Sequence, residues 1–506
     1  MKTPVLLRNT YLLVLAMAML ATSCRKNFLD EPKPTQSVTS EDVFKTEEGV
    51  RAYLHGIYSK MRQPWFPIGA TAFNSTDNWG YIAINLTRVN KGIDIINPGG
   101  WYQFDYRLEN REPTYRRTIF TWQFFYESIN QANILIEGVE QSSTLAASVK
   151  AQLLAEGRAL RAWMYFELAR EFQHTIAKDA NAPGIPLYTQ PTSIDNKGKP
   201  RGTLRQVFDL INEDLAFAVQ NLGTQRSYKS QITKPVAYGM QARVALEQGQ
   251  WAAAAEAALK ARDGFALDRN RYRGNFSDIA NSPEVIWGFP QTITGSSQSL
   301  YYGTPSSFFE KTGQGYDNFY MYDQLVNSFT NSDIRNTFFI TNAASGNQRR
   351  FSTNKFGSTT SSTVTLITGQ TVALRQTDFE EGLPMMRVAE MLLIEAEARA
   401  EQGQTAAAKA LLFQLQKNRD PDAAESANTG AALIAEILLE RRKELYGELG
   451  IDYLDIKRRQ LPLQRAGNHP VAYRFNLAPN AQDLVLKIPQ RELDTNEFIG
   501  PADQNQ

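Results

Sequence analysis

Apolar residues recur at helical spacing over several long stretches of this 506-residue chain. In the first stretch they follow the three- and four-residue period of one helix face, and they are Val50, Leu54, Ile57, Tyr58 and Met61. Ser40 stands before two acidic residues, which predicts an N-cap there. Pro64 is expected to end this first helix.

The same period predicts further helices at about residues 117–140, 148–172, 203–221, 384–402, 404–418 and 430–447. Thr203 is expected to cap the third of these. Two stretches without a long period, 64–115 and 264–383, are rich in Gly and Asn and are predicted to be irregular. Short apolar runs at Val285–Phe289 and Val364–Ile367 are candidate strands. The pattern predicts a mainly α fold, a helical scaffold carrying two loop-rich regions where binding commonly resides.

A four-residue sequence, Glu-Gln-Gly-Gln, occurs at residues 247–250 and again at 401–404. Each copy lies between one predicted helix and a second, Ala-rich one. Gly249 and Gly403 would supply the left-handed residue of a tight reversal, and the alanines would let the paired helices approach closely. This is the construction of a tetratricopeptide-type helical hairpin. Chance similarity between two Ala-rich helices is the alternative.

The first 23 residues have the organisation of a secretory signal. Basic residues flank an apolar run, Tyr11–Leu20, that is too short to span a bilayer, and small residues follow it. The next residue, Cys24, is the only cysteine of the chain. The sequence Leu20–Cys24 resembles a bacterial lipobox, with Ala21 where a branched aliphatic residue is commonest. We therefore expect a lipid on Cys24 that tethers the protein to a membrane. A conventionally cleaved signal is the alternative.

Charge and motif content restrict the chemistry of the protein. The chain has 54 Lys and Arg residues and 53 Asp and Glu residues, a net charge of +1. It therefore lacks the excess positive charge that favours binding to the phosphate backbone of nucleic acids. The three histidines are His55, His174 and His469, and none shares a helix with another at metal-ligand spacing. No nucleophile, phosphate-loop or dinucleotide motif occurs. We therefore predict no catalytic residue, no metal and no cofactor.

Charged residues on the predicted C-terminal helices have a simpler explanation than catalysis. Glu395 and Arg399 stand four residues apart, as in an ordinary helix ion pair. The charges of residues 440–448 are expected to have structural or solvated roles as well. Carboxylate pairs are nevertheless abundant, so their number does not exclude glycosidase chemistry.

Aromatic residues gather in both irregular regions and suggest a surface for sugars. The face of an aromatic ring carries partial negative charge, so the C–H face of a sugar ring stacks on it, while carboxylates and amides bond the hydroxyls. The candidate ligand-binding residues are Asp77, Asn78, Trp79, Trp101, Tyr102, Tyr301, Tyr302 and Tyr320. For any single ring the alternative is a core position under a long loop.

Four stretches, in order, carry the pattern of a known family. They are F-K-T-E-E-G-V-R-A-Y-L-H-G-I-Y at 44–58, A-E-G-R-A-L-R-A-W-M-Y-F-E-L at 155–168, R-V-A-E-M-L-L-I-E-A-E-A at 387–398 and E-R-R-K-E-L-Y-G-E-L-G-I-D-Y-L-D-I-K-R at 440–458. Together with the lipobox they resemble the SusD/RagB family of nutrient-binding lipoproteins of Bacteroidetes. One departure is the segment 448–453, which is longer than the family's turn by about one residue and lacks its Arg.

The resemblance implies tetratricopeptide-like hairpins packed against an irregular lobe, in a non-catalytic protein on the outer face of the outer membrane. There it would capture oligosaccharides for a SusC-like, TonB-dependent barrel. The expected segments are a signal at 1–23, a tether at 24–45, an N-terminal helical region at 46–263 with the insertion 64–115, and a C-terminal region at 264–506 with the lobe 264–383 and helices at 384–458. Oligopeptide cargo, a scaffold that binds only proteins, and a secreted glycosidase are the alternatives.

Overall fold

The computed structural model describes residues 40–65, 76–193, 195–290, 304–309, 316, 318–340, 351–356, 360–365, 371–376 and 381–505. The chain divides into two compact units, 1–43 and 44–506. In the first unit only the short helix α2 (Ser40–Val43) is described, so the predicted signal and Cys24 lie outside the described residues. The account below concerns the second unit.

Helices make up most of the second unit. The longer ones are α3 (Glu47–Lys60), α4 (Gly80–Lys91), α6 (Arg116–Gln141), α7 (Ala147–Phe172), α8 (Leu204–Asn221), α9 (Lys234–Glu247), α10 (Trp251–Arg262), α15 (Val388–Glu401), α16 (Thr405–Arg419), α17 (Gly430–Leu445) and α18 (Ile451–Arg458). The shorter ones are α5 (Gln103–Tyr106), α11 (Gly274–Ser277), α13 (Ser306–Phe309), α14 (Asp323–Val326) and α19 (Gln490–Thr495).

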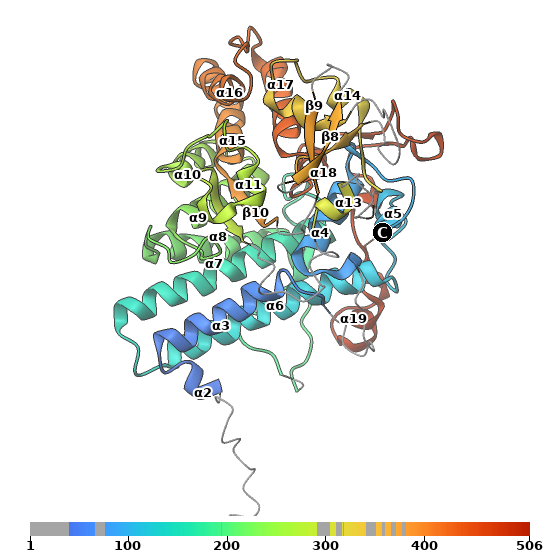
Figure 1. Cartoon of the computed structure of the whole chain (residues 1–506). Coiled ribbons are helices and arrows are strands. Elements are labelled where there is room, and N and C mark those ends of the chain that lie inside the picture. The colour runs from blue at the N-terminus through green and yellow to red at the C-terminus, as the bar shows by residue number, and fades with distance from the viewer. Residues whose placement is uncertain are drawn as a thin grey trace, which may run out of the picture. The chain divides into compact units, whose positions relative to one another are not determined.

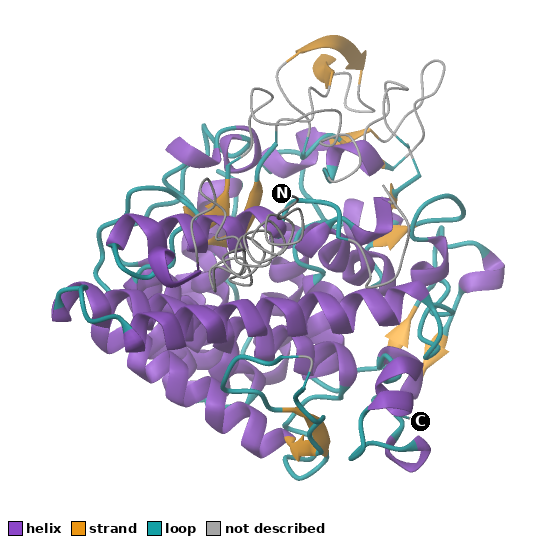
Figure 2. Cartoon of the chain, turned by 90° about the horizontal axis from the view of Figure 1, so that it is seen from below, coloured by secondary structure: helices purple, strands orange, loops and turns teal. Residues whose placement is uncertain are grey.

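The strands are short, and those in the described residues form two-stranded antiparallel sheets (Figure 2). The pairs are β1 (Ile95–Ile96) with β5 (Tyr320–Met321), β2 (Pro183–Pro186) with β3 (Arg201–Thr203), β4 (Val285–Phe289) with β10 (Leu383–Arg387), β6 (Phe339–Ile340) with β7 (Ser352–Thr353), β8 (Thr360–Thr365) with β9 (Thr371–Gln376), and β11 (Leu463–Gln464) with β12 (Asn476–Leu477). The architecture is therefore mainly α, as the sequence predicts.

Successive helices pack against one another in a series of hairpins (Figure 1). Helix α6 packs on α7, α7 on α8, α9 on α10, α10 on α15, and α15 on α16. The two Glu-Gln-Gly-Gln copies form the turns of two of these hairpins. Gly249 has φ +68° and Gly403 has φ +73°. In both turns the residue after the glycine donates its N–H to the carbonyl five positions back, from Gln250 to Ala245 and from Gln404 to Arg399. The hairpin prediction is confirmed.

Replacing Gly403 by Val should lower the free energy of unfolding by about 1–2 kcal/mol, because a β-branched residue is strained at positive φ. A Cβ at this position would meet no atom within 4 Å, so the cost is conformational and not steric. Gly223→Val is the matched control, since Gly223 is equally open and has no positive φ. Denaturant unfolding of both variants measures the difference, and equal stability would contradict the turn assignment.

Two predictions in the N-terminal half are wrong. Ser40 begins the separate helix α2, whereas Thr46 caps α3 by accepting from the Gly49 N–H at 3.1 Å. The helix breaks between them where the Phe44 ring packs beside Tyr53, with centroids 5.4 Å apart. Region 64–115 is also less irregular than expected, because it contains α4. Every residue of α4 is buried, polar ones such as Asn85 and Arg88 included, and these polar residues made the segment resemble a loop in sequence.

Other predicted elements are confirmed with small shifts. Thr203 caps α8 in a reciprocal capping box with Gln206. Strand β4 spans the predicted Val285–Phe289. The helix predicted from 384 begins only at Val388, because residues 383–387 pair with β4 as strand β10. Residues 360–365 form a strand, which overlaps the predicted run in its described part.

Buried ion pairs connect the helices to the irregular regions. Arg88 of α4 contacts Glu167 and Glu171 of α7, each at 2.5 Å. The Glu444 carboxylate contacts Arg387 at 2.8 Å, Arg335 at 3.0 Å and Arg419 at 3.1 Å. All these side chains are at most 1% exposed. The charges of residues 440–448 are thus structural, as predicted, but they pair across the fold instead of along one helix.

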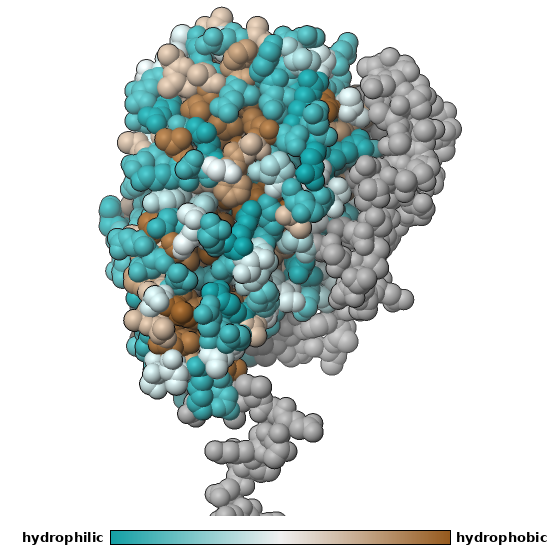
Figure 3. Space-filling view, turned by 60° about the vertical axis from the view of Figure 1, so that its left-hand side comes forward, coloured by the Kyte–Doolittle hydropathy of each residue, from teal (hydrophilic) through white to brown (hydrophobic). Residues whose placement is uncertain are grey.

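The face drawn in Figure 3 is mainly hydrophilic, with hydrophobic residues in small separate groups. Among the described helices, none is both long and apolar enough to cross a membrane.

Candidate functional site

The two irregular regions meet in the short sheet of β1 and β5. Ile95 pairs with Met321 and Ile96 with Tyr320. This pairing brings residues 95–102 of the first region against residues 316 and 318–321 of the second. The surface that both regions build here is the candidate functional site.

Trp101 lies in a strained turn directly after β1. Gly100 before it has φ +91°, and Tyr102 after it has φ +66°, a left-handed conformation that is uncommon for a residue with a side chain. Such strain persists only where the surroundings enforce it, and it concentrates at binding sites. The turn leaves Trp101 half-buried while Tyr102 is buried.

A chain of asparagine amides holds this turn. The Trp101 carbonyl accepts from the side chains of Asn97 at 2.7 Å and Asn318 at 2.8 Å. Asn318 also donates to Asn97, which in turn donates to Asn90 of α4 at 2.9 Å. All three amides are buried. The position of Trp101 is therefore fixed by hydrogen bonds from both irregular regions.

Aromatic packing supports the Trp101 ring from the second region. Tyr316 contacts it edge to face, with centroids 6.0 Å apart. Tyr316 in turn stacks on Phe308 at 5.4 Å. A supported ring keeps its orientation without a ligand, so binding would cost it little conformational entropy.

The C-terminal segment fixes helix α5, which follows the turn. The Tyr106 hydroxyl lies 2.7 Å from His469 Nδ1, and Arg465 donates to the carbonyls of Tyr106 and Asn90. Burial lowers the pKa of His469 to about 4, so this ring is neutral near pH 7, and burial raises the pKa of Tyr106 to about 12. These groups support the site and do not titrate near neutral pH.

The sequence did not single out Phe104 of α5, whose side chain is 52% exposed. Arg107 lies over the rings of Phe104 and Tyr473, at 5.8 and 5.0 Å. Phe104 follows Trp101 by three residues and adds an exposed ring to the same segment. Its place in the aromatic-rich region 64–115 was the only sequence signal for it.

Asp77 is the candidate carboxylate and lies in a 3₁₀ turn, Thr76–Asn78. Its carboxylate contacts Arg116 at 2.6 Å, and its carbonyl accepts from Arg117 at 2.6 Å. Arg117 also pairs with Asp105 and lies over the Tyr102 ring at 5.5 Å. Arg117 thus connects Asp77 to the residue beside Trp101.

The other candidates have different surroundings. Trp79, Tyr102 and Tyr320 are only 3%, 4% and 8% exposed, so the expectation that they offer free ring faces is wrong for this structure. The Trp79 indole donates to the Arg62 carbonyl at 3.0 Å, and Asn78 is fully buried against Trp65. Tyr301 and Tyr302 lie outside the described residues.

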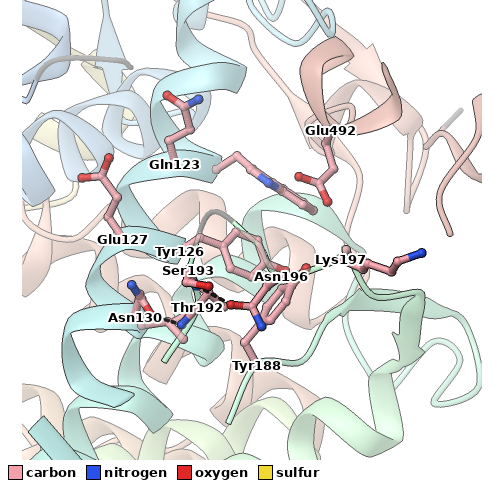
Figure 4. Close-up of a pocket in the computed structure, with 13 residues that line it drawn as sticks. Gln123, Tyr126, Glu127, Asn130, Tyr188, Thr192, Ser193, Asn196, Lys197 and Glu492 are labelled. Carbon is pink, nitrogen blue, oxygen red and sulfur yellow. Dashed lines mark hydrogen bonds between the residues drawn. The ribbon is translucent and has the colours of Figure 1, made fainter. Parts of the chain in front are cut away.

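A second concave surface lies between α6, residues 188–198 and α19 (Figure 4). It has a volume of about 380 Å³, within the range of small-molecule sites. Its lining residues are Trp122, Gln123, Tyr126, Glu127, Ile129, Asn130, Tyr188, Thr192, Ser193, Asn196, Lys197, Gly198 and Glu492. The sequence missed this pocket because three segments far apart in the chain form it. No group of His, Cys, Asp and Glu suited to a metal ion occurs among the residues that the structure describes.

A series of helical hairpins that carries a loop-built aromatic surface defines a class of helical-repeat protein, and comparisons agree with that class. A family described as "Starch-binding associating with outer membrane" matches residues 27–246, and the SusD family matches residues 341–500. SusD-like protein P38 of Formosa agariphila is 25% identical over 495 residues, covering 89% of this chain and 90% of that protein.

Solved structures share the fold. A SusD-like carbohydrate binding protein from Bacteroides vulgatus aligns with a TM-score of 0.75 at 22% identity, covering 91% of this chain and 98% of that one. A SusD superfamily protein from Bacteroides thetaiotaomicron aligns with a TM-score of 0.75 at 21% identity, covering 91% and 100%. The chain belongs to the SusD family.

Proposed function

We propose that this protein binds oligosaccharides at the Trp101 turn and delivers them to a SusC-like, TonB-dependent barrel of the outer membrane. The observation that carries the proposal is the half-buried Trp101, which stands between two residues of positive φ and whose carbonyl accepts from two buried amides, Asn97 and Asn318. Membership in the SusD family and the carbohydrate-binding relative from Bacteroides vulgatus support the cargo class.

The site would act by stacking and hydrogen bonding alone. The Trp101 face would stack on the C–H face of a sugar ring, and the exposed Phe104 ring would extend that apolar contact. The Asp77 carboxylate and the exposed Arg116 beside it would bond sugar hydroxyls. No bond of the sugar is broken in this proposal, which agrees with the absence of catalytic motifs from the sequence.

Trp101→Ala should weaken oligosaccharide binding about tenfold and lower the melting temperature far less than the loss of a fully buried Trp does. A stacking ring contributes on the order of 1–2 kcal/mol, and about 1.4 kcal/mol corresponds to a factor of ten. Titration calorimetry with neutral oligosaccharides of glucose, xylose, mannose and galactose measures the effect.

Trp79→Ala is the control for a buried ring and should instead cost about 3–5 kcal/mol of stability. If Trp101→Ala unfolds the protein, or binds every sugar as the parent does, the Trp101 assignment fails. Parent protein that binds oligopeptides and no sugar would favour the peptide alternative.

We also propose that Cys24 carries the lipid that anchors the protein to the outer face of the outer membrane. It is the only cysteine and directly follows the predicted signal. Cys24→Ala should move the protein from the membrane fraction to the soluble fraction, as detected by immunoblotting after cell fractionation. Wild-type levels of the variant in the membrane fraction would contradict the lipid anchor.

A further inference from the structure

We propose that the pocket in Figure 4 is a second binding site, built for a neutral sugar unit and separate from the Trp101 turn. The proposal rests on the proposed function for its ligand class. Both sites use helix α6, but different residues of it, Arg116 and Arg117 beside Asp77 and Trp122 to Asn130 at the pocket, so substitutions can remove each site without the other.

The floor of the pocket is one face of helix α6. Trp122 and Tyr126 stand four residues apart, and so do Gln123 and Glu127, so rings and polar groups alternate along this face. The Trp122 ring packs against Phe172 of α7, with centroids 4.8 Å apart, and against Tyr126, also at 4.8 Å. Tyr188 from the opposite wall meets Tyr126 edge to face at 5.8 Å. The buried Trp122 thus supports the half-buried rings of Tyr126 and Tyr188, which give the pocket a rigid aromatic surface of the kind on which a sugar ring stacks.

The opposite wall is a segment that we name the strap, residues 187–200, of which residue 194 is not described. Buried Asn133 donates to the carbonyls of Tyr188 and Gln190 at 2.9 and 3.1 Å, and Tyr165 donates to the Tyr188 carbonyl at 2.9 Å. In the middle of the strap the Thr192 N–H donates to Asn130 at 2.8 Å (Figure 4).

At its far end the strap is held by the segment that follows α19. Asn496 donates to the Lys199 carbonyl at 3.0 Å and to the Glu492 carboxylate at 2.7 Å. The strap is thus fixed at both ends and in the middle. The pocket is already formed before any ligand enters, so binding need not order this wall.

The polar groups at the pocket suit hydroxyls. Gln123 Oε1 is buried and has no hydrogen-bond partner among the described residues, which is uncommon for a buried acceptor. Glu127 accepts from the Trp65 indole through one oxygen at 2.8 Å, and no hydrogen bond from another described residue to its second oxygen is found. Sugar hydroxyls donate to such acceptors, and an apolar ligand would leave them unsatisfied.

The charged side chains that line this pocket disfavour acidic ligands. Two carboxylates line it, Glu127 and Glu492, against one cation, Lys197. The Lys197 ammonium pairs with Glu497 at 3.0 Å, both side chains are well exposed, and it points away from the other labelled residues (Figure 4). No arginine is among the described residues that line the pocket, whereas arginine is the usual partner of carboxylate and sulfate groups. The geometry therefore favours a neutral sugar over a uronate or a sulfated one.

The test is calorimetry on the full chain, purified in detergent, with neutral hexaoses of glucose, xylose, mannose and galactose. Oligogalacturonate and an uncharged hexapeptide are the comparison probes. The parent should bind a neutral hexaose at two sites per chain. Thr192→Trp should fill the pocket and weaken one of these sites at least tenfold, because Thr192 is exposed and lines it. Tyr188→Ala should weaken the same site by removing a ring of its wall.

Ser143→Trp is the matched control, an exposed position at the end of α6 that does not line the pocket, and it should bind as the parent does. Trp101→Ala should remove the other site and leave the pocket site intact. One site that only Trp101→Ala removes would overturn the pocket and retain the proposed function. One site that only the pocket variants remove would overturn the Trp101 assignment. Preference of the pocket for oligogalacturonate or the peptide would overturn the neutral-sugar proposal, and no binding of any hexaose would overturn both.

Discussion

Glu444→Gln should destabilise the protein by about 3–5 kcal/mol, the usual cost of removing one partner from a buried ion pair. The Glu444 carboxylate is the shared partner of three buried guanidinium groups, those of Arg335, Arg387 and Arg419. These groups hold the pKa of Glu444 well below its usual range against the opposing effect of burial. A neutral amide would leave the cations of the cluster without their common counter-charge.

Urea unfolding monitored by circular dichroism measures this loss, since urea does not screen charge as guanidinium does. Glu137→Gln is the control, because Glu137 is an exposed residue of α6, and it should change stability by less than about 0.5 kcal/mol. A Glu444→Gln variant as stable as the control would show that the cluster does not contribute to the fold.

Acidification should unfold the protein between about pH 4.5 and 2 through the carboxylates that pair with Arg88. Although burial opposes ionisation, Arg170 and Arg88 lower the pKa of Glu167 to about 2, and Arg88 and Lys91 lower that of Glu171 to about 2. In the unfolded chain the pKa of each is about 4.5. The stability from these groups is therefore present above pH 4.5 and is lost as the pH falls toward 2. Each carboxyl contributes on the order of 3 kcal/mol.

Guanidinium groups also lower the pKa of Glu444 and of Asp455 against the effect of burial, so these carboxyls lose stability in the same acidic range. Groups whose pKa is raised act at higher pH. Burial raises the pKa of Glu156 and of Asp452 to about 7, so acidification from pH 7 to 4 favours the folded state through them. The buried His174, with its pKa lowered to about 4, has the opposite effect between pH 6.5 and 4. Below about pH 4 none of these three groups contributes further change.

Urea unfolding of a Glu171→Gln variant across this range isolates the carboxylate. The variant should be less stable than the parent at pH 6 and should approach the parent near pH 2, because the parent then loses the same interaction. Glu256→Gln, which alters a fully exposed carboxylate, should follow the parent at every pH. Parallel curves for Glu171→Gln and the parent would contradict the mechanism.

Apolar periodicity predicted most of the long helices, and it missed α4, although Ile82, Leu86 and Val89 follow helical spacing within it. Helix α4 carries the polar residues Asn85, Arg88 and Asn90 at buried positions. Polar residues at these positions are typical of a loop when the sequence is considered alone. The Arg88 guanidinium pairs with Glu167, which stands 79 residues from it in the chain. The charges of α17 show the same limit, since Arg335 stands 109 residues from Glu444. Partners at such separations leave no local signal.

Aromatic content indicated the region of the candidate site. It did not distinguish a ring exposed for stacking from a ring buried in the core. Trp79 and Trp101 occupy similar Gly- and Asn-rich sequence, yet Trp79 is 3% exposed and bonds the Arg62 carbonyl, whereas Trp101 is half-buried. The difference arises from backbone dihedral angles at Gly100 and Tyr102 that the composition does not encode. The Figure 4 pocket could not be recognised in the sequence. Trp122 and Tyr126 lie on a regular helix, and the strap that carries Tyr188 is a connection between two elements.

The pairing of β1 with β5 also has a consequence for the order of folding. Asn318, which holds the Trp101 carbonyl, stands 221 residues from Asn97 in the chain. Contacts between residues so far apart in the chain close a long loop. The conformational entropy of that loop is lost before the new contacts compensate for it. The helical hairpins are local and need no such closure. A nascent chain would therefore form its helical hairpins first and the surface around Trp101 last. A product truncated before residue 318 would have hairpins without a supported Trp101.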